Sequence, residues 1–593
     1  MDVQQVWPRP VPTIGDQTSA SDRAADPRGW AFSDADRAVL QRIMGSRRDI
    51  RRFRPDPVPE EAVRRIVAAA HLAPSVGHSQ PWRFVVVQDP VTRTRAAVFA
   101  DRARMAQAAR MDPDAARHLL DLDLEGIREA PLGLVVCCDR RAAPDGVLGR
   151  STFQDADMWS CACAIENLWL AARAEGLGVG WVTLFKPEEL ADLVRAPEGV
   201  ATLGWLCLGW PDERPPEPGL ERRGWSERLP LDELVMRERW PGAAGGRDPA
   251  PPTSRLAMPG QDAVVAAHDS ADRILTPPGS LGVLDRAVDK VLALAATSGP
   301  GPGAAGTLVL AAADHPVAGL GVSAYPASVT RDVAGAALAG VSVGARAAFE
   351  AGLDLVVVDA GIDGPPLAGI RPIRPSGRRG DLVSVDGLSR ADAESLVAAG
   401  AGLALDVLGA RPGPIALGEV GVGNSTVAAA LACALLGVEP RRLVGLGAGA
   451  DSAIVAVKRD VVEAALTRAL GRPGVRRRPL RLLAALGGGE LAVLTGVVLG
   501  AAAEGGLVVL DGMATSVAAL LASEIEPAVT AHLVAGQRSR EIGHQLVLEA
   551  LGLEPLLDLR IRAGEGVGAA MAARLLRTAV RIRSESARTA AGV

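Results

Sequence analysis

The chain has 593 residues, enough for about two to four domains of roughly 100 to 200 residues each. Lys and Arg number 64 against 69 Asp and Glu, so the formal charge of -5 gives no general attraction to nucleic acid or an anionic membrane. The longest apolar stretch, residues 491–503, is shorter than the roughly 20 residues that cross a bilayer. The N-terminus shows no secretory signal. We therefore expect a multidomain cytoplasmic protein without a nucleic-acid or membrane partner.

Aromatic residues divide the chain into two regions. All ten Trp and six of the seven Phe precede residue 241, so two different hydrophobic cores are expected. Pro and Gly are dense just after this point, as is typical of a linker. The predicted parts are a flexible leader at residues 1–30, a first domain at 31–240, a linker at 241–253 and a second domain at 254–593.

Neither region shows a metal-binding pattern. The six Cys lack metal-ligand spacing and are interpreted as small core residues. Asp314 and His315 are adjacent, but the sequence shows no third ligand for them. We therefore expect no metal.

The first region mixes helical spacing with short apolar strands. Helices are predicted at residues 34–45, 58–71 and 155–175, and strands at 84–88, 133–139, 180–184 and 205–209. This pattern predicts an α+β domain with a small sheet covered by helices.

The second region begins with two helices and continues with alternating strands and Ala-rich helices. The helices are predicted at 263–274 and 281–296, and the strands at 308–312, 355–358, 414–418, 443–446 and 507–510. This alternation predicts an α/β domain with a doubly wound parallel sheet and accessory helices. Ligands of such sheets bind beyond the carboxyl ends of the strands.

Three segments of the first region carry groups suited to a phosphate and a planar ligand. Residues 47–51 (RRDIR) place three guanidinium groups around one carboxylate, although a solvated charged segment has the same composition. Residues 73–82 (APSVGHSQPW) lead into a predicted strand, and residues 178–183 (GVGWVT) offer glycines for close backbone approach. Together these segments resemble the nitroreductase-like FMN-binding family.

Within that family the region is most similar to the 5,6-dimethylbenzimidazole synthases, through RRDIR, APSVGHSQPWRF at 73–84 and NLWLAARAEGLGVGWVTLF at 167–185. The resemblance implies that FMNH2 is a substrate which O2 fragments, with the ribityl chain supplying one carbon of the new base. It also implies a homodimer and a separate flavin reductase. Asp49 matches the acidic residue implicated in proton transfer, and Thr183 matches a Ser beside the flavin. The implied flavin-binding residues are Arg47, Arg48, Arg51, Pro74, Ser75, Gln80, Gly180 and Trp181.

Two Gly-rich segments of the second region are candidates for phosphate binding and proton transfer. Residues 418–426 (GEVGVGNST) follow a predicted strand and open a helix, so their amides could cradle a phosphate. Residues 564–568 (GEGVG) place Glu565 between glycines just before another helix. That carboxylate either balances the helix dipole or takes part in catalysis.

These segments, with PPGSLGVLD at 277–285 and VVLDGMAT at 508–515, resemble the nicotinate-nucleotide:dimethylbenzimidazole phosphoribosyltransferase family. The resemblance implies transfer of phosphoribose from nicotinate mononucleotide to dimethylbenzimidazole, giving α-ribazole 5′-phosphate and nicotinate, with Glu565 as the general base. The implied nucleotide- and phosphate-binding residues are Glu419, Gly421, Gly423, Asn424, Ser425 and Lys458. For Lys458 a surface position on a helix remains the alternative. Departures from the family pattern are Thr276, Pro316, Gly489 and Gln537.

The two implied reactions are consecutive, because the product of the first is the acceptor of the second. The sequence therefore predicts a bifunctional enzyme that makes and activates the lower ligand of cobalamin. One alternative is an FMN-dependent nitro- or quinone reductase fused to a transferase. Another is a second domain that only binds the benzimidazole.

Overall fold

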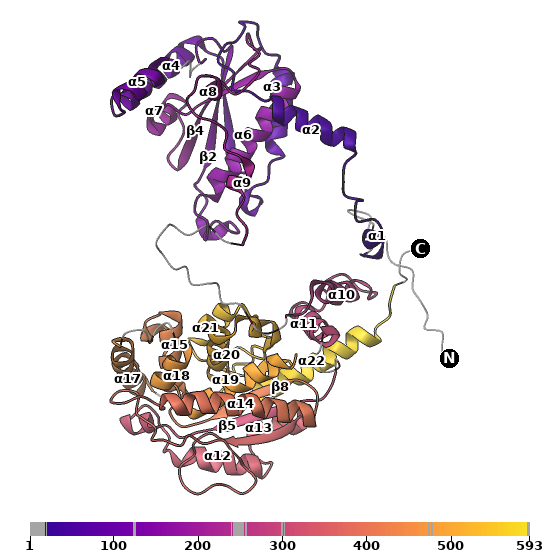
Figure 1. Ribbon diagram of the computed structural model, residues 1–593, viewed down its shortest axis with the longest axis vertical. Helices are drawn as coiled ribbons and strands as arrows, with labels where there is room; N and C mark the ends of the chain where they lie inside the picture. Colours follow the sequence, from indigo (N-terminus) through magenta and orange to yellow (C-terminus); the bar gives the residue numbers. More distant parts are fainter. Residues whose placement is uncertain are drawn as a thin grey trace. The chain divides into compact units, whose positions relative to one another are not determined.

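The computed structural model describes residues 18, 20–121, 126–238, 240, 254, 256, 258–297, 301, 303–447, 449, 451–472, 475 and 478–589. They form two compact units, one within residues 28–246 and one that groups residues 247–593 with the described residues before 28 (Figure 1). A short helix, α1 (Ala20–Ala25), lies in the segment predicted as a leader. The predicted linker at 241–253 lies outside the described residues.

The N-terminal unit is built on a four-stranded antiparallel sheet of order β1-β2-β4-β3. Its strands are β1 (Trp82–Val87), β2 (Leu132–Asp139), β3 (Gly178–Val182) and β4 (Val200–Gly209). Its helices are α2 (Asp34–Ser46), α3 (Glu60–His71), α4 (Pro90–Ala108), α5 (Pro113–Asp121), α6 (Ala156–Ala174), α7 (Pro187–Leu193), α8 (Gly219–Arg222) and α9 (Leu231–Leu234), with 3-10 turns η1 (Val76–His78) and η2 (Pro144–Gly146).

Side chains of the central strand β2 alternate between two hydrophobic layers. Leu134 and Val136 pack with Ile66 of α3 and Leu168 of α6 on one face of the sheet. Val135, on the opposite face, belongs to the cluster that includes residues of α4 and α7. This two-residue period is the one that a strand buried on both faces requires. The predicted α+β class is therefore confirmed.

Five of the six cysteines are buried, as the sequence predicts. Cys163 of α6 is exposed, so its interpretation as a core residue is wrong. The neighbouring Cys161 is buried on the face of the same helix that packs against the sheet. Positions two apart on a helix point in different directions, which explains why one thiol is inside and the other outside.

The C-terminal unit contains a six-stranded parallel sheet of order β10-β9-β8-β5-β6-β7. Its strands are β5 (Thr307–Ala312), β6 (Asp354–Asp359), β7 (Arg371–Pro372), β8 (Ile415–Val420), β9 (Val508–Leu510) and β10 (Leu533–Ala535). Its helices are α10 (Gln261–Asp272), α11 (Val283–Thr297), α12 (Ser328–Leu338), α13 (Val343–Ala351), α14 (Arg390–Ala410), α15 (Asn424–Leu436), α16 (Pro440–Leu443), α17 (Ser452–Leu470), α18 (Pro479–Leu486), α19 (Gly489–Ala503), α20 (Met513–Ile525), α21 (His544–Leu551) and α22 (Val567–Glu585), with 3-10 turns η3 (Pro316–Leu320) and η4 (Pro527–His532).

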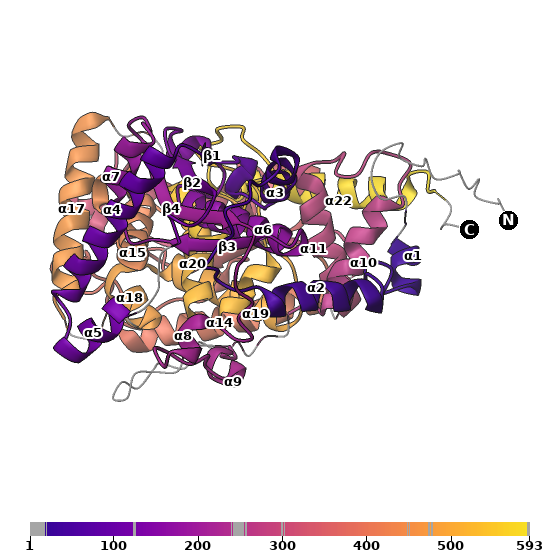
Figure 2. The ribbon, with the colours of Figure 1, turned by 90° about the horizontal axis from the view of Figure 1, so that it is seen from above.

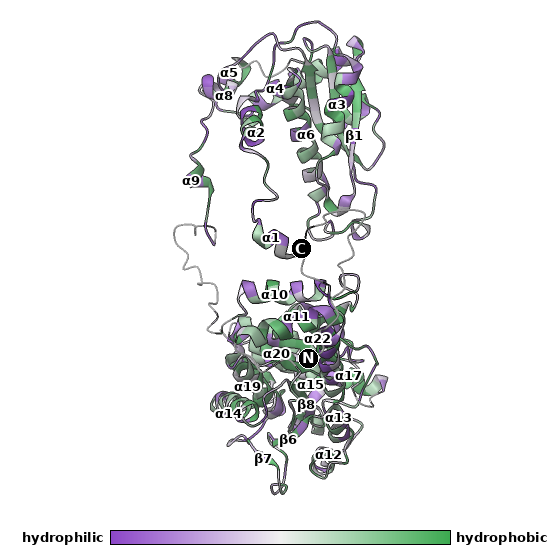
Figure 3. Ribbon diagram, turned by 90° about the vertical axis from the view of Figure 1, so that its right-hand side faces the viewer, coloured by the Kyte–Doolittle hydropathy of each residue, from purple (hydrophilic) through white to green (hydrophobic). Residues whose placement is uncertain are grey.

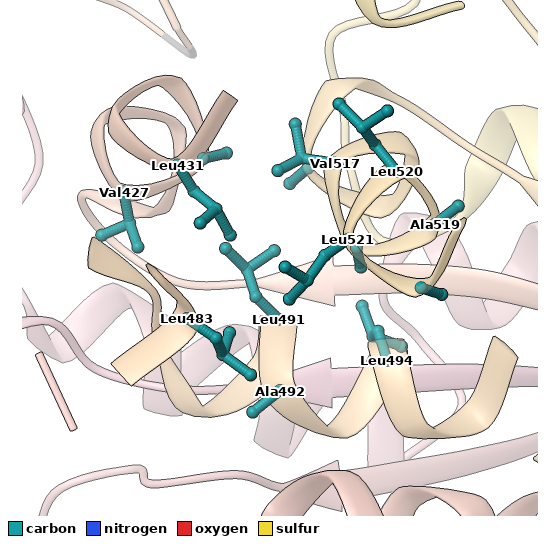
Figure 4. Packing of buried hydrophobic residues seen from close by; sticks show 14 of the residues in the cluster. Val427, Leu431, Leu483, Leu491, Ala492, Leu494, Val517, Ala519, Leu520 and Leu521 are labelled. Atoms are coloured by element: carbon teal, nitrogen blue, oxygen red, sulfur yellow. The ribbon is translucent and has the colours of Figure 1, made fainter. Parts of the chain in front are cut away.

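Helices cover both faces of this sheet. One hydrophobic cluster joins Leu417 of β8 to α14, α15, α18, α19 and α20, and Figure 4 shows Leu431, Leu491 and Leu521 converging within it. A second cluster joins Ala416, the neighbour of Leu417 on β8, to α11, α13 and α22. Consecutive residues of one strand thus serve opposite layers, as in doubly wound folds. The predicted parallel sheet is confirmed.

The helices α10, α11 and α22 pack side by side (Figure 2). Arg583 of α22 is buried and donates to a carboxylate oxygen of Asp285 on α11 at 2.6 Å. It also pairs with Asp289, one turn further along α11. These charge-assisted bonds satisfy a guanidinium that would otherwise be costly to bury.

One predicted strand is wrong. Residues 443–446 do not pair with the sheet, because Leu443 ends α16 and the following residues form a loop. Leu443 and Val444 are nevertheless buried, so the apolar run reflects packing and not strand pairing. The short strands β7 and β10 were not predicted, since two or three residues carry too little periodicity to identify a strand.

Two stretches of the described chain, Ser328–Ala351 and Arg390–Ala410, are long and apolar enough to cross a membrane by length and composition alone. The second is α14, which packs along α19 and buries Leu396, Leu403 and Val407 in the core. The first is divided by a turn between α12 and α13. Core packing accounts for the apolar character of α14.

Candidate active sites

The C-terminal unit has a cavity of about 350 Å³ at the carboxyl ends of its parallel strands. Strand β8 ends at Glu419 and Val420, and the loop that follows leads directly into α15. Gly423 adopts a φ of 92°, which only glycine adopts without strain, and thereby turns the chain into the helix. All seven residues predicted for this site line the cavity: Glu419, Gly421, Gly423, Asn424, Ser425, Lys458 and Glu565.

Lys458 is a buried residue of the cavity wall. Its side chain comes from α17, is only 3% exposed, and donates from Nζ to Oγ of Ser425 at 3.0 Å. Desolvation lowers the pKa of the ammonium group, and the nearby Glu541 carboxylate partly offsets this effect. The surface-helix interpretation of Lys458 is therefore wrong. The group is placed to hold an anion at the start of α15.

Four carboxyl groups, those of Glu419, Asp511, Glu541 and Glu565, line the same cavity, and burial raises the pKa of the first three. Desolvation raises the pKa of Glu419 to about 8, with repulsion from Asp511, Glu490 and Glu565 adding to the effect and a hydrogen bond from Asn424 opposing it. Desolvation also raises the pKa of Asp511 to about 6. Asp511 accepts hydrogen bonds from Nε2 of Gln537 at 2.9 Å and from the amide of Gly568, in the first turn of α22, at 2.8 Å.

Glu565 sits between the two glycines as the sequence predicts, in a left-handed conformation with a φ of 57°. Its side chain is 9% exposed, and Oε2 accepts a hydrogen bond from the amide of Gly344 at 3.0 Å. Gly344 lies in the first turn of α13, so Glu565 interacts with the N-terminus of a helix other than α22, which follows it in the chain. This contact therefore does not support the interpretation that Glu565 balances the dipole of α22.

In the N-terminal unit, the arginine-rich segment lies along strand β3. The backbone of Asp49 forms an isolated parallel β-bridge with Val179, and its Oδ1 accepts a hydrogen bond from the amide of Trp181 at 3.2 Å. Arg51 pairs with Oδ2 of Asp49 and also donates to the carbonyl of Trp181 at 3.2 Å. Arg47 stacks over the ring of Trp169 at 4.6 Å. The sequence-predicted acid and its guanidinium neighbours therefore form one cluster.

Protein surroundings raise the pKa of Asp49 even though 41% of its side chain is exposed. Desolvation is the dominant cause, and Arg51, the Trp181 amide and Arg47 oppose it. A carboxyl group of this kind, with a raised pKa and an open face, is suited to exchanging a proton with a ligand.

The glycines of β3 serve the chain's own packing. A side chain at Gly178 would meet Ile50, and one at Gly180 would overlap the carbonyl oxygen of Ile50. The close backbone approach at these positions is therefore between β3 and residues 49–51. Thr183 directly follows the strand and is exposed.

The remaining predicted flavin residues form a second cluster before β1. Ser75 Oγ accepts from the amide of Gln80 at 3.0 Å, and the next residue, Val76, donates to Oγ of Ser160 on α6 at 3.1 Å. Pro74 belongs to the same turn. The first cluster contacts α6 at Trp169. Trp169 lies nine residues after Ser160, which corresponds to roughly 13 Å along the helix axis. The sheet order places β1 and β3 at opposite edges.

Comparison with known proteins matches each unit to a separate family. A nitroreductase family model matches residues 44–210, and a phosphoribosyltransferase family model matches residues 256–593. The chain is 45% identical over 204 residues to a 5,6-dimethylbenzimidazole synthase of Rhodospirillum rubrum, covering 34% of this chain and 96% of that protein. It is 39% identical over 326 residues to a nicotinate-nucleotide–dimethylbenzimidazole phosphoribosyltransferase of Thermus thermophilus, covering 54% of this chain and 95% of that protein.

The chain belongs to both families. A crystal structure of CobT from Thermus thermophilus aligns with the whole of that chain and 56% of this one, at 37% identity and a TM-score of 0.52. The fusion that the sequence predicts is therefore confirmed, as are the two fold classes.

The departures from the phosphoribosyltransferase pattern have local explanations at three positions. Gln537 donates to Asp511, so it takes part in the carboxyl network. Gly489 begins α19, where any side chain would overlap the carbonyl oxygen of Ala360. Pro316 begins the 3-10 turn η3, a position that needs no backbone donor.

Several residues of the site were not predicted. Asp511 directly follows β9, within the segment 508–515. A carboxylate just after a predicted strand could have identified it as a site residue. Glu490 does not line the cavity, but its carboxylate adds to the repulsion on Glu419, and it is buried with 3.1 Å between its Oε1 and Nε2 of His315. Arg540 and Arg562 line the cavity as exposed cations.

The raised pKa of Glu419 gives a pH-dependent stability that can be tested. The folded state holds this proton more tightly than the unfolded state, so the unfolding free energy should fall as pH rises from about 4.5 to about 8. The variant Glu419→Gln should lack this decline. Relative to the variant, the parent should therefore lose up to roughly 4 kcal/mol across that window. Denaturant-dependent hydrogen exchange in α19 measures this difference, and parallel pH curves for the two proteins would contradict it.

Proposed function

We propose that this chain makes 5,6-dimethylbenzimidazole and then attaches phosphoribose to it. The observation that carries the proposal is that each unit matches nearly the full length of a different enzyme, and the base named in the first enzyme is the acceptor named in the second. The carboxyl-lined cavity and the Asp49–Arg51 cluster supply polar groups of the kinds that these two reactions need. The substrates are FMNH2, O2 and nicotinate mononucleotide.

In the first reaction, FMNH2 supplies the ring that O2 fragments. Asp49 exchanges a proton with the substrate, while Arg51 holds the Asp49 carboxylate in place. The candidate flavin-binding groups are Arg47, Arg48, Arg51, Pro74, Ser75, Gln80, Gly180 and Trp181, with Thr183 providing a hydroxyl beside the ring. These residues fit a flavin phosphate because guanidinium groups and backbone amides favour an anion. A separate reductase supplies FMNH2.

In the second reaction, one nitrogen of the benzimidazole attacks the anomeric carbon of nicotinate mononucleotide. The bond from that carbon to the nicotinate nitrogen breaks, and its electron pair leaves with nicotinate. The other benzimidazole nitrogen loses its proton to Glu565, and the negative charge of this carboxylate also favours the cationic transition state. Lys458, Ser425 and the start of α15 hold the phosphate, and Glu419 faces the ribose. No metal enters this scheme.

The N-terminal unit functions as a homodimer in this proposal. Its two clusters of flavin residues are anchored at separate points of α6, so two chains can combine one cluster from each. Helix α2 buries none of its residues within one chain and exposes Val39, Leu40 and Met44. Helix α9 also exposes two leucines, Leu231 and Leu234, beside two acidic residues (Figure 3). We place the protein in the cytoplasm, where all of these substrates are available.

The role of Asp49 is tested by Asp49→Asn. The amide keeps the shape of the side chain but cannot exchange the proton, so flavin binding should persist while dimethylbenzimidazole formation is lost. Chromatography of the reaction with FMNH2 and O2 measures both flavin consumed and base formed. Asp212→Asn, a change of the same kind at an exposed residue, is the control. Parental product yield from Asp49→Asn would remove this residue from the mechanism, and turnover of an added quinone without loss of flavin would indicate a reductase.

The role of Glu565 is tested by Glu565→Gln, which removes the proton acceptor and its charge. The transferase rate should fall by about 10²-fold or more, with a smaller change in benzimidazole binding. If Glu565 only stabilised a helix end, the loss would be roughly 0.3 to 1 kcal/mol of stability with transfer intact. Nicotinate release and calorimetric binding of the base separate these outcomes. Glu554→Gln, an exposed residue paired with Arg286, is the control.

The shared flavin site is tested by complementation between two inactive variants. Asp49→Asn disables one cluster and Gln80→Ala the other, so co-expressing both chains should restore part of the dimethylbenzimidazole synthase activity. Co-expressing Asp49→Asn with Arg51→Ala should restore none, because both changes lie in the same cluster. If each chain carried a complete site, the first pair would also remain inactive.

A further inference from the structure

The carboxylate of Glu565 rests on the first turn of helix α13. The amide of Gly344 donates to Oε2 at 3.0 Å, and the Glu565 side chain is almost fully buried. Ser342 caps this helix, because its Oγ accepts from the amide of Ala345 at 3.2 Å. The turn that holds Glu565 is thus itself fixed by a side-chain cap.

The two segments touch so closely that position 344 admits only glycine. A Cβ added to Gly344 would lie 2.6 Å from Cβ of Glu565 and would overlap its carbonyl oxygen. Both groups belong to the backbone or to its first side-chain atom, so neither can move away without moving the loop. The close contact between the Glu565 loop and α13 therefore depends on the absence of a side chain at position 344.

The contact places the two carboxylate oxygens of Glu565 in different surroundings. The amide N–H of Gly344 holds Oε2 and leaves Oε1 for a ligand. Glu419, Asp511 and Glu541 line the same cavity, and burial raises the pKa of each. Of these four carboxyl groups, Glu565 is the one that accepts a hydrogen bond from the first turn of α13.

We infer that Gly344 is a positioning residue of the transferase, acting through Glu565 by fixing one carboxylate oxygen and leaving the other free for the benzimidazole proton. Gly344 itself does not line the cavity. The inference rests on the proposed role of Glu565 as general base. Displacements near 1 Å in a catalytic group cost on the order of 10²-fold in rate, which is the size of effect expected.

The test compares Gly344→Ala with a matched change in the neighbouring helix. Gly335→Ala in α12 also adds one methyl group to a helical glycine, but nothing lies within 4 Å of that position. Each substitution is made in the full chain, once in the parent and once in the Glu565→Gln variant. Nicotinate release from nicotinate mononucleotide gives kcat and KM, and calorimetry gives the affinity for dimethylbenzimidazole.

Gly344→Ala should lower kcat on the order of 10²-fold in the parent, with little change in base affinity, and should have little further effect in Glu565→Gln. Gly335→Ala should leave kcat unchanged in both. A parental kcat for Gly344→Ala, or an equal loss in both backgrounds, would overturn the inference. Parental activity of Glu565→Gln alone would instead reject the proposed base.

Ser342→Ala covers the case in which Gly344→Ala does not fold. It removes the cap of α13 without adding an atom, so it should loosen the turn that holds Glu565 and lower kcat in the parent only. The same loss in the Glu565→Gln background, or no loss in the parent, would count against the inference.

Discussion

The burial of carboxyl groups beside one another is the constraint around which the transferase site is arranged. Glu419, Asp511 and Glu565 line one cavity, and like charges in a desolvated space repel strongly. The fold gives each a different hydrogen-bond partner: Asn424 for Glu419, the first turn of α22 for Asp511 and the first turn of α13 for Glu565. These partners come from α15, α22 and α13, so the site draws on helices from both faces of the sheet.

The flavin-family unit uses a similar principle with fewer groups. Asp49 has one guanidinium partner and one backbone amide, and it keeps an open face. Because β3 and the arginine-rich segment pack backbone against backbone, the position of Asp49 is set by the sheet and not by a mobile loop. Joining this unit to the transferase in one chain raises the local concentration of the base at its second site.

Sequence reasoning succeeded where chemistry and local structure lie on one segment. The loop after β8 and the glycines around Glu565 were predicted because each follows a strand or opens a helix within ten residues. Gly344 was missed because it meets Glu565 only through tertiary packing, and Glu490 because it acts on Glu419 from a distant segment of the chain. The expected strand at 443–446 was wrong for a related reason, since buried apolar residues need not pair with a sheet. The division of the flavin residues between two clusters likewise depends on the strand order.

The central claim is that one chain carries out two consecutive reactions. It is tested most directly by supplying FMNH2 labelled with carbon-13 throughout its ribityl chain, together with O2 and unlabelled nicotinate mononucleotide, and analysing the products by mass spectrometry. The account predicts α-ribazole 5′-phosphate with one labelled carbon, located in the base, and an equal amount of free nicotinate. Reoxidised, intact FMN with no labelled ribazole product would contradict it.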